Sequence, residues 1–309
     1  MKMKHHYTGV ILAATLLLAA CGKEKASDPN DASRFTIAIE STDNNGSKMY
    51  LDPTTLQLES FDNIWINGSG CMVNGNTLVG HVPAVPQGQY YLACPSWLVG
   101  LNTEIIPEGG IIDNAHPAKT INRLYFPNFY NSGDYGPIPL AALVPHNATT
   151  LTFKHLCSYI KVRIKAMDGM TYVDSIVVFA NNNYISGEGV ITFYSNTEIR
   201  GIYNRSRLGK DRYVTLYTYS DDLSDSYKDF MIPVMSRTGT DFTGSPTHLT
   251  ITVYGQDEDG NPRSVSKTSL NPTALERKKI YTALFTPGQS GFSLGTGATY
   301  DDGGTVWNN

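Results

Sequence analysis

The chain has 309 residues, a formal net charge of −4 and 17% charged residues. This length suggests about two domains, and a chain so close to neutral lacks the concentrated basic face that nucleic acid binding requires. The 19 tyrosines, together with frequent Thr, Val, Ile and Phe, favour strands over helices.

The N-terminus has the pattern of a secretory signal. A basic start precedes an apolar run at residues 10–18, which is too short to cross a bilayer as a helix. The run ends in Leu18-Ala19-Ala20-Cys21, which resembles a bacterial lipobox. The resemblance implies cleavage between Ala20 and Cys21 and acyl chains on Cys21, which together give stable anchoring. An ordinary signal peptide followed by a chance cysteine is the alternative. We assign residues 1–20 to the signal and residues 21–34 to a polar tether.

Residues 35–154 predict a first β domain. Residues 35–40 are its first strand, because Phe35, Ile37 and Ile39 fall on one face, and a polar loop then leads to Lys48. Asn74-Gly75 predicts a hairpin, since type I′ turns need two residues with positive φ. The other strands expected here cover residues 56–58, 63–66, 72–73, 77–79, 89–94, 103–112, 121–126 and 138–144.

Residues 151–166 predict the connection between two domains. Leu151 and Phe153 are apolar at odd positions, whereas Ile160, Val162 and Ile164 are apolar at even positions. Side chains alternate between the faces of a strand, so this change of parity moves the apolar set to the opposite face. A long strand that leaves one core and enters a second one explains the change. A bulge near residues 155–157 is the alternative.

Residues 155–286 predict a second β domain, with a hairpin turn at Asp259-Gly260. Its expected strands cover residues 172–180, 189–194, 212–220, 229–235, 247–254, 263–267 and 277–286. Short strands at this spacing indicate β-sandwiches, so the expected fold class is all-β. The tail, residues 287–309, predicts a further strand that pairs with its own sheet or with a neighbour's. The alternating residues of this strand are Phe292, Leu294, Thr296, Ala298 and Tyr300.

The segment TLTFKHLCSYIKVRI, which begins at Thr150, carries a family resemblance. It resembles the F-x-H-x-x-S-x-I-x-V-x-I signature of fimbrillin-like surface lipoproteins of Bacteroidetes-type bacteria. The matching residues are Phe153, His155, Leu156, Ser158, Ile160, Val162 and Ile164. The resemblance implies two tandem transthyretin-like Greek-key β-sandwich domains after the lipoprotein signal. It also implies a stalk or tip subunit of a cell-surface fimbria that supports adhesion.

The same resemblance implies a mechanism of assembly. The precursor reaches the outer membrane surface as a lipoprotein, a trypsin-like protease cuts after the first strand, and a strand from another subunit fills the groove that is left. Related proteins place an arginine after that strand, where this chain has Lys48, while Arg34 precedes the strand. Cutting at Arg34 would remove the lipid but keep the strand, so we expect cleavage after Lys48. The tail strand Phe292–Tyr300 is the candidate donor. The expected partners are other fimbrial subunits, the outer membrane through the lipid, and a host or bacterial surface ligand.

No motif predicts chemistry, and we expect no enzyme activity, cofactor or metal. Gly291–Gly295 matches G-x-S-x-G, but no histidine follows Ser293 as a nucleophile elbow would require. Residues 257–261 hint at calcium, yet the EF-hand spacing fails and a hairpin turn fits better. His155 is expected to be a hydrogen-bonded histidine at the domain junction. Cys71 and Cys94 are either a disulfide pair or two buried thiols.

A surface glycan-binding lipoprotein is the alternative function. It would share the anchor and the β domains, would need exposed aromatic residues such as Trp65, Trp97 or Tyr130, and would not be cleaved at Lys48. An exported hydrolase is a third hypothesis, and it would need a cleft with convergent carboxylates.

Overall fold

The described part of the chain folds almost entirely into strands. The computed structural model describes residues 31–39, 63–106, 119–131, 139–193, 199–204, 209–235, 246–277 and 279–296. Its helices are the short 3-10 turns η1 (Ala32–Arg34), η2 (Ser96–Leu98) and η4 (Gly209–Arg212). The expected all-β class is therefore confirmed. Within these ranges no helix has the length and apolarity needed to cross a membrane.

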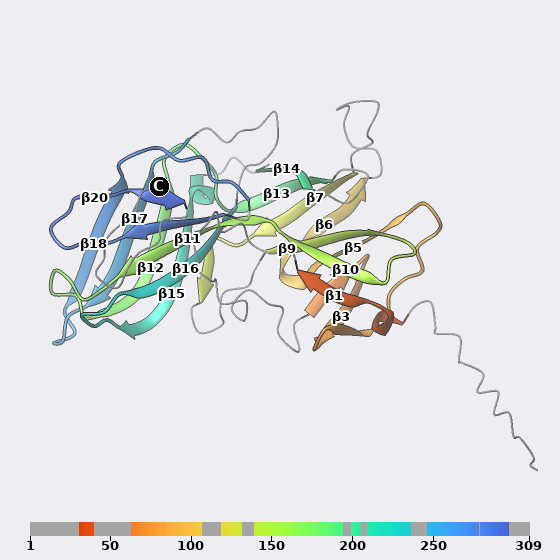
Figure 1. Cartoon of the computed structure of the whole chain (residues 1–309), viewed down its shortest axis with the longest axis horizontal. Coiled ribbons are helices and arrows are strands. Elements are labelled where there is room, and N and C mark those ends of the chain that lie inside the picture. Colours follow the sequence, from red (N-terminus) through yellow and green to blue (C-terminus); the bar gives the residue numbers. More distant parts are fainter. Residues whose placement is uncertain are drawn as a thin grey trace, which may run out of the picture.

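The first domain, on the right in Figure 1, is a closed barrel. Around the barrel the strands follow the order β1, β10, β9, β5, β2, β3 and β4. The bounds are β1 (Thr36–Ile39), β2 (Asn63–Ile66), β3 (Ser69–Asn74), β4 (Thr77–Gly80), β5 (Tyr90–Pro95), β9 (Leu140–Pro145) and β10 (Thr150–His155). The barrel encloses the first core, which includes Phe35, Ile64, Ile66, Val73, Leu78, Tyr91, Leu151 and Phe153.

Two tight hairpins build one wall of this barrel. The turn between β2 and β3 is Asn67-Gly68, with φ of 44° and 100°, and these two positive values fit type I′. The hairpin predicted at Asn74-Gly75 is present, but Asn74 still pairs with Thr77 in the ladder. Its loop is residues 75–76, in which only Gly75 has a positive φ, so the predicted type I′ turn belongs to the neighbouring hairpin instead.

A four-stranded sheet joins the two halves of the chain. It has the order β14, β13, β7 and β6, where β6 (Val99–Ile106) and β7 (Lys119–Phe126) come from the first half, and β13 (Gly187–Phe193) and β14 (Ile199–Asn204) from the second. Figure 1 shows these strands beside β5, β9 and β10. A junction core lies beneath them and includes Leu92, Cys94, Leu124, Phe126, Leu143, Leu156, Cys157, Ile191 and Phe193.

The second domain consists of two sheets around the second core. One sheet has β16 (Lys228–Met235), β11 (Cys157–Ile164), β19 (Ile280–Leu284) and β21 (Leu294–Thr296). The other has β20 (Gly291–Phe292), β18 (Pro262–Ser269), β17 (Leu249–Gln256), β12 (Tyr172–Ala180), β15 (Tyr213–Asp222) and β8 (Phe129–Asn131). The second core includes Tyr130, Ile160, Val162, Ile176, Val178, Leu216, Ile232, Ile251, Val253 and Phe292. Strand β8 comes before the predicted domain boundary at residues 154–155, yet it belongs to a sheet of the second domain. No single boundary in the sequence therefore separates the strands of the two domains.

Strands β10 and β11 run along the long axis from one domain to the other (Figure 1). Leu151 and Phe153 face the first core, Leu156 and Cys157 lie in the junction core, and Ile160 faces the second core. The ladder breaks at Leu156, whose N–H donates to the carbonyl oxygen of Pro139 at 2.9 Å. The change in apolar parity therefore reflects a long segment that leaves one core and enters another.

Candidate functional site

Strand β1 closes the first barrel between β10 and β4. It pairs in parallel with β10 over four positions, from Thr36 with Thr150 to Ile39 with Phe153. On its other side it pairs with β4 at a single position, Thr36 with Thr77. A strand that closes a sheet removes two free edges at once, because each edge otherwise presents unpaired N–H and C=O groups. Loss of β1 would therefore open the barrel along both β10 and β4.

The turn before β1 fixes where the strand enters. The Asp31 carboxylate accepts a hydrogen bond from the Ser33 N–H at 2.8 Å and caps η1. This backbone hydrogen bond is the main reason why the pKa of Asp31 lies below its usual value. The Ile37 N–H donates to Asn76 at 2.7 Å, which supplements the short ladder to β4. The segment is thus held by local contacts at its start, by a four-position ladder to β10 and by a much shorter ladder to β4.

The side chains of this segment contribute directly to the first core. Phe35 is fully buried and packs edge-on against Tyr91, with ring centroids 5.2 Å apart, while Ala32 is buried and Ile37 packs against the same core. Burial of a phenylalanine contributes about 1.5–3 kcal/mol. Removal of the segment would leave an apolar groove, and its floor would include Tyr91, Leu151 and Phe153.

Arg34 lies in this packed region. Its guanidinium carbon sits 4.5 Å from the centre of the Phe35 ring and 4.9 Å from that of the Tyr91 ring. Its Nε and Nη2 atoms are buried and make no hydrogen bond within the described part of the chain. A protease that cuts after arginine must bind the extended arginine side chain in the specificity pocket of the protease. In the folded barrel the Arg34 side chain is packed and is not available for such binding. The other predicted processing residues, Ala20, Cys21 and Lys48, lie outside the described residues.

The described part of the tail is folded into its own domain. Phe292 is buried, stacks on Phe285 at 5.9 Å, and belongs to β20, which pairs in parallel with β18 at two positions. After Ser293 the chain moves to the opposite sheet, where β21 pairs antiparallel with β19 at three positions and Leu294 packs against the second core. Ala298 and Tyr300 lie outside the described residues. The period of two in the tail is thus divided between two short strands of two different sheets.

The three described cysteines are free, buried thiols. Cys71 belongs to the first core and Cys94 to the junction core, so they lie on opposite sides of the barrel wall, and of the two alternatives for this pair the structure has two buried thiols. Burial raises the pKa values of Cys71, Cys94 and Cys157. Such thiols are not ionised near neutral pH and are poor nucleophiles.

The residues that hinted at chemistry lie apart from one another. Ser293 of the G-x-S-x-G match is exposed between β20 and β21. His155 is buried, and its Nδ1 lies 2.6 Å from the Tyr159 hydroxyl, so the expectation of a hydrogen-bonded histidine at the junction is confirmed. Among the described residues, no group of His, Cys, Asp or Glu could hold a metal ion.

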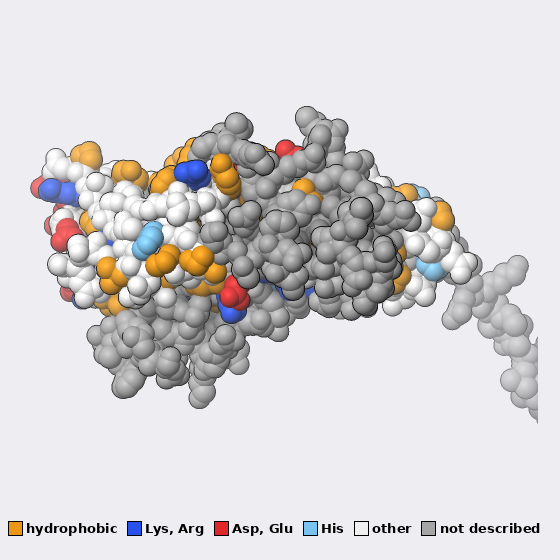
Figure 2. Space-filling model, turned by 90° about the horizontal axis from the view of Figure 1, so that it is seen from above, with side chains coloured by type: hydrophobic (Ala, Val, Ile, Leu, Met, Phe, Trp, Pro, Cys, Tyr) orange, Lys and Arg blue, Asp and Glu red, His pale blue; other side chains and the backbone are white. Residues whose placement is uncertain are grey.

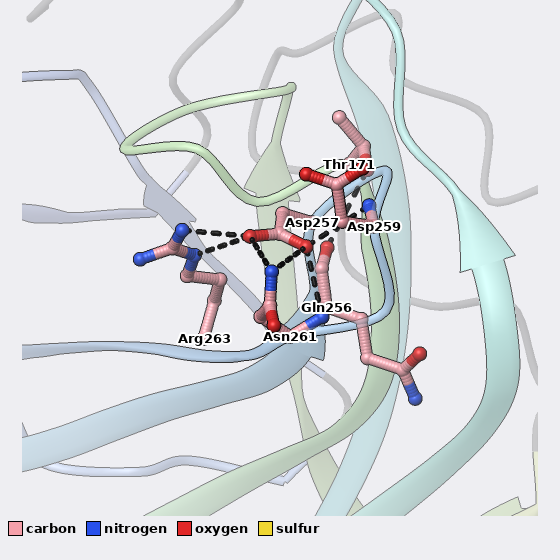
Figure 3. A network of polar contacts seen from close by, with 6 residues as sticks. All are labelled: Thr171, Gln256, Asp257, Asp259, Asn261 and Arg263. Carbon is pink, nitrogen blue, oxygen red and sulfur yellow. Dashed lines mark hydrogen bonds and ion pairs between the residues drawn. The ribbon is translucent and has the colours of Figure 1, made fainter.

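The acidic turn after β17 is a hairpin loop (Figure 3). The Asp257 carboxylate accepts hydrogen bonds from the Asn261 N–H at 2.8 Å and the Asp259 N–H at 3.1 Å, and it forms an ion pair with Arg263 at 2.6 Å. The side-chain amide of Asn261 donates to both of its oxygens at 3.1 Å. The turn thus consumes the lone pairs that a calcium ion would need, as the hairpin interpretation of these residues predicted.

The aromatic residues expected for a glycan platform are not the exposed ones. Tyr130 is 2% exposed and belongs to the second core, while Trp65 and Trp97 are partly buried against the junction core. The large aromatic side chains exposed in the described structure are Tyr125, Phe129, Phe179, Tyr217, Tyr219 and Tyr254. Alternation within β12, β15 and β17 places several of these on the solvent side, and that pattern was the signal available in the sequence.

Comparisons with known proteins give distant similarities. No family model matches the sequence, and a search of curated proteins finds no match. The chain is similar to the crystal structure of a proposed cell adhesion protein from Bacteroides ovatus ATCC 8483, with 13% identity and a TM-score of 0.45 over 85% of this chain and 94% of that chain. It is also similar to a fimbrial protein from Bacteroides vulgatus ATCC 8482, with 11% identity and a TM-score of 0.42 over 85% of this chain and 97% of that chain.

Proposed function

We propose that the protein is a non-enzymatic structural subunit of a cell-surface fimbria, of the fimbrillin-like type, that assembles by exchange of a strand between subunits. One observation carries this proposal: β1 is a four-residue strand that closes a barrel and is paired to β4 at a single position. A closing strand with few contacts is one that the domain can lose and replace. In this proposal the closed barrel and the two-sheet domain correspond to the two tandem transthyretin-like Greek-key sandwiches that the resemblance implies.

Proteolysis after Lys48 is the proposed trigger. Such a cut lies beyond β1, so it separates the lipid on Cys21 and the closing strand from the rest of the chain in one step. Arg34 is the competing site, and two features count against it: its guanidinium is packed on Phe35 and Tyr91, and a cut there would leave β1 in the barrel. The lipid carries the precursor to the outer membrane surface before this step.

The strand that replaces β1 comes from the tail of another subunit. The opened groove would offer the backbone of β10 and the alternating apolar side chains Leu151 and Phe153. A donor that alternates apolar residues fits such a groove, because its main chain completes the ladder and its side chains fill the pockets. Phe292 and Leu294 provide that alternation, and β20 and β21 hold them in their own domain by only short ladders.

The proposal predicts the N-terminus of the assembled subunit. Polymers sheared from the cell surface should contain chains that begin at Met49, because only those chains have lost β1. N-terminal sequencing of the polymer bands and of the monomer bands measures this directly. Polymers whose chains begin at Cys21 would exclude assembly by this route and would favour a lipid-anchored protein that keeps β1.

A further inference from the structure

The solvent side of the six-stranded sheet of the second domain forms a continuous uncharged surface, here called the tyrosine face. Its positions follow from the strand register, because paired residues lie on the same side of a sheet. The tyrosine face consists of three rows across the strands, and in the second row Thr215 is only 8% exposed. The rows are Asn131, Tyr217, Ser175, Tyr254 and Ser264; Phe129, Thr215, Val177, Thr252 and Ser266; and Tyr213, Phe179, Thr250 and Thr268. The intervening residues, such as Leu216, Ile176 and Val253, point into the second core.

No position in these three rows carries a charged side chain. Soluble surfaces normally intersperse charges of both signs, so a sheet face of this size without any is unusual. Figure 2 shows that charged groups are also sparse on the visible part of the second domain, where hydrophobic and uncharged polar groups predominate. A partner of the tyrosine face is therefore expected to be uncharged as well. An anionic partner would find no counter-charge in the rows, and a cationic one would find only the Asp174 carboxylate at the bulge beside them, which already accepts hydrogen bonds from Ser220 and Gln256.

Two tyrosines mark the centre of the tyrosine face. Tyr217 and Tyr254 are 44% and 46% exposed, and both pair with Ser175 on the strand between them. Adjacent strands lie about 4.8 Å apart, which places the two tyrosines about 10 Å apart across the sheet. Two exposed rings on a rigid sheet at this separation suit an extended partner that presents flat, partly apolar units, with one further unit between the two that the rings contact.

A third tyrosine, Tyr219, lies over the same surface and has an unfavourable backbone conformation. Tyr219 and Ser220 both have positive φ, 54° and 64°, at a bulge where the register of β12 with β15 shifts. A positive φ is an outlier for a residue as bulky as tyrosine, and such strain tends to persist where function requires it. Tyr219 is 72% exposed, yet its hydroxyl donates to the Asn131 side chain at 2.9 Å, and Ser220 donates to Asp174 at 2.7 Å. These contacts fix an exposed ring in place.

The rest of the tyrosine face offers hydroxyl groups. The Thr250 and Thr268 hydroxyls lie 3.0 Å apart, and those of Thr252 and Ser266 lie 2.9 Å apart. Tyrosine and phenylalanine are enriched in protein–protein interfaces whereas serine is depleted, so the rings alone do not choose between a protein and a sugar, and the hydroxyls between them favour the sugar. Hydroxyls can both donate and accept hydrogen bonds, which matches the hydroxyl groups of a sugar, while aromatic rings stack on its apolar faces.

We propose that the tyrosine face binds a neutral glycan, with Tyr217 and Tyr254 stacking on two sugar rings that are separated by a third and Tyr219 contacting the same chain from the side. This gives the protein a ligand-binding function in addition to assembly. It does not rest on strand exchange, because every residue involved belongs to the second domain and none to β1 or its groove.

Affinity electrophoresis of the purified full-length chain tests the proposal. The probes are four neutral polysaccharides, namely mannan, galactan, xylan and soluble starch, and two anionic ones, polygalacturonate and chondroitin sulfate. The chain should be retarded by at least one neutral polysaccharide, and the double variant Tyr217→Ala/Tyr254→Ala should lower that affinity about tenfold or more. Tyr125→Ala is the matched control, since Tyr125 is equally exposed, at 43%, on β7 outside the tyrosine face, and it should bind like the unchanged chain.

A second variant keeps the rings and alters the surface between them. Ser175→Arg places a long charged side chain between Tyr217 and Tyr254, and it should also abolish retardation while leaving the thermal unfolding midpoint close to that of the unchanged chain. The proposal is overturned if none of the neutral polysaccharides binds, if only the anionic ones do, or if the tyrosine variants bind as tightly as the Tyr125→Ala control. It is equally overturned if these variants change only self-association, because the face would then be an interface between copies.

Discussion

Arg34 shows how the position of one side chain bears on processing. Sequence alone offers two basic residues near the first strand, Arg34 and Lys48. The structure places the Arg34 guanidinium on two core rings with Nε and Nη2 buried. Buried guanidinium nitrogens without hydrogen bonds are costly, so the burial of Nε and Nη2 is offset by the stacking on Phe35 and Tyr91, which would be lost together with β1.

Asp257 gives a prediction about pH. Hydrogen bonding, first of all from the Asn261 backbone N–H, lowers the pKa of Asp257 to about 2. A carboxyl with a folded pKa below its unfolded value contributes stability above the unfolded value of 3.8, and this contribution is lost as the pH falls toward 2. The thermal unfolding midpoint should therefore fall less steeply between pH 4 and pH 2 in Asp257→Asn than in the unchanged chain.

The neighbouring residue supplies the control for this measurement. Glu258→Gln removes the same charge from an exposed position in the same turn, and its midpoint should follow the pH dependence of the unchanged chain. If the unfolding midpoint depends on pH in the same way in the unchanged chain and in Asp257→Asn, the turn does not stabilise the ionised Asp257 carboxylate. In that case the network of Figure 3 would have no thermodynamic role.

At the scale of elements, the closing strand and the tail are similar in length and in the apolar surface that they bury. Strand β1 is a short strand in the first barrel, and β20 and β21 are short strands at the edges of the second domain's sheets. Each contributes buried aromatic surface, Phe35 in one case and Phe292 in the other. Exchange between subunits would thus replace one short apolar strand by another, and the lost burial of Phe35, about 1.5–3 kcal/mol, would be offset by the donor's side chains.

A charge placed on alternate faces of the tail tests the donor assignment. Leu294 is only partly buried in its own domain, so Leu294→Lys can keep its ammonium in water and should lower monomer stability modestly. In the closed groove of another subunit the same lysine would have no access to water, and polymers should fail to form. The measurement is the amount of heat-labile ladder on gels of surface material, alongside the unfolding midpoint of the monomer.

Ser293→Lys is the matched control, because it adds the same charge one residue earlier, at an exposed position on the other face of the tail. It should leave the ladders unchanged. If Leu294→Lys forms as much heat-labile polymer as the unchanged chain, or if both variants lose polymer equally, then the tail does not bind another subunit as an alternating strand. The donor strand would then lie elsewhere in the chain.

At the scale of the whole molecule, the two domains share structure more closely than two independent sandwiches would. Strand β13 pairs with β7 across the halves of the chain, and Gly189 on β13 packs so closely that an added Cβ would lie 2.5 Å from the Phe126 ring. The junction core takes residues from both halves, and β8 joins a sheet of the second domain. The junction is therefore a packed core, and it constrains the orientation of one domain relative to the other more strongly than a flexible linker would.

The sequence predicted the parts of this fold that depend on local pattern. Residues 172–180 are rich in β-branched residues and fairly apolar on both faces, as in a central strand, and β12 has the same bounds. The parity change between Phe153 and Ile160 marked the passage between cores because alternation is a local property. The dipeptide Asn67-Gly68 also carried a local signal, and it forms the type I′ turn that was expected one hairpin later.

What depends on pairing between distant strands could not be predicted. Nothing in the residues of β7 specifies β13 as its neighbour, and a three-residue strand such as β8 has no period to detect. The burial of Tyr130, which the glycan-binding alternative would need at the surface, depends on the same kind of long-range pairing, here of β8 with β15. For the candidate site, the alternation of Phe35, Ile37 and Ile39 predicted a strand. That this strand closes a barrel follows only from the long-range pairing with β10 and β4.

The central claim, that β1 must leave the barrel before subunits join, is tested most directly by locking it in place. Thr36 and Thr77 are antiparallel partners, and Cα atoms of such partners lie about 4.5–5.5 Å apart, within the range that a disulfide spans. The three native cysteines within the described residues are buried thiols, so among those residues oxidation of Thr36→Cys/Thr77→Cys should join the new pair. The oxidised variant should still be cut after Lys48 but should form no polymers, reduction should restore them, and Thr36→Cys alone should polymerise normally. Polymers that form at the normal rate while the disulfide is intact would contradict the account.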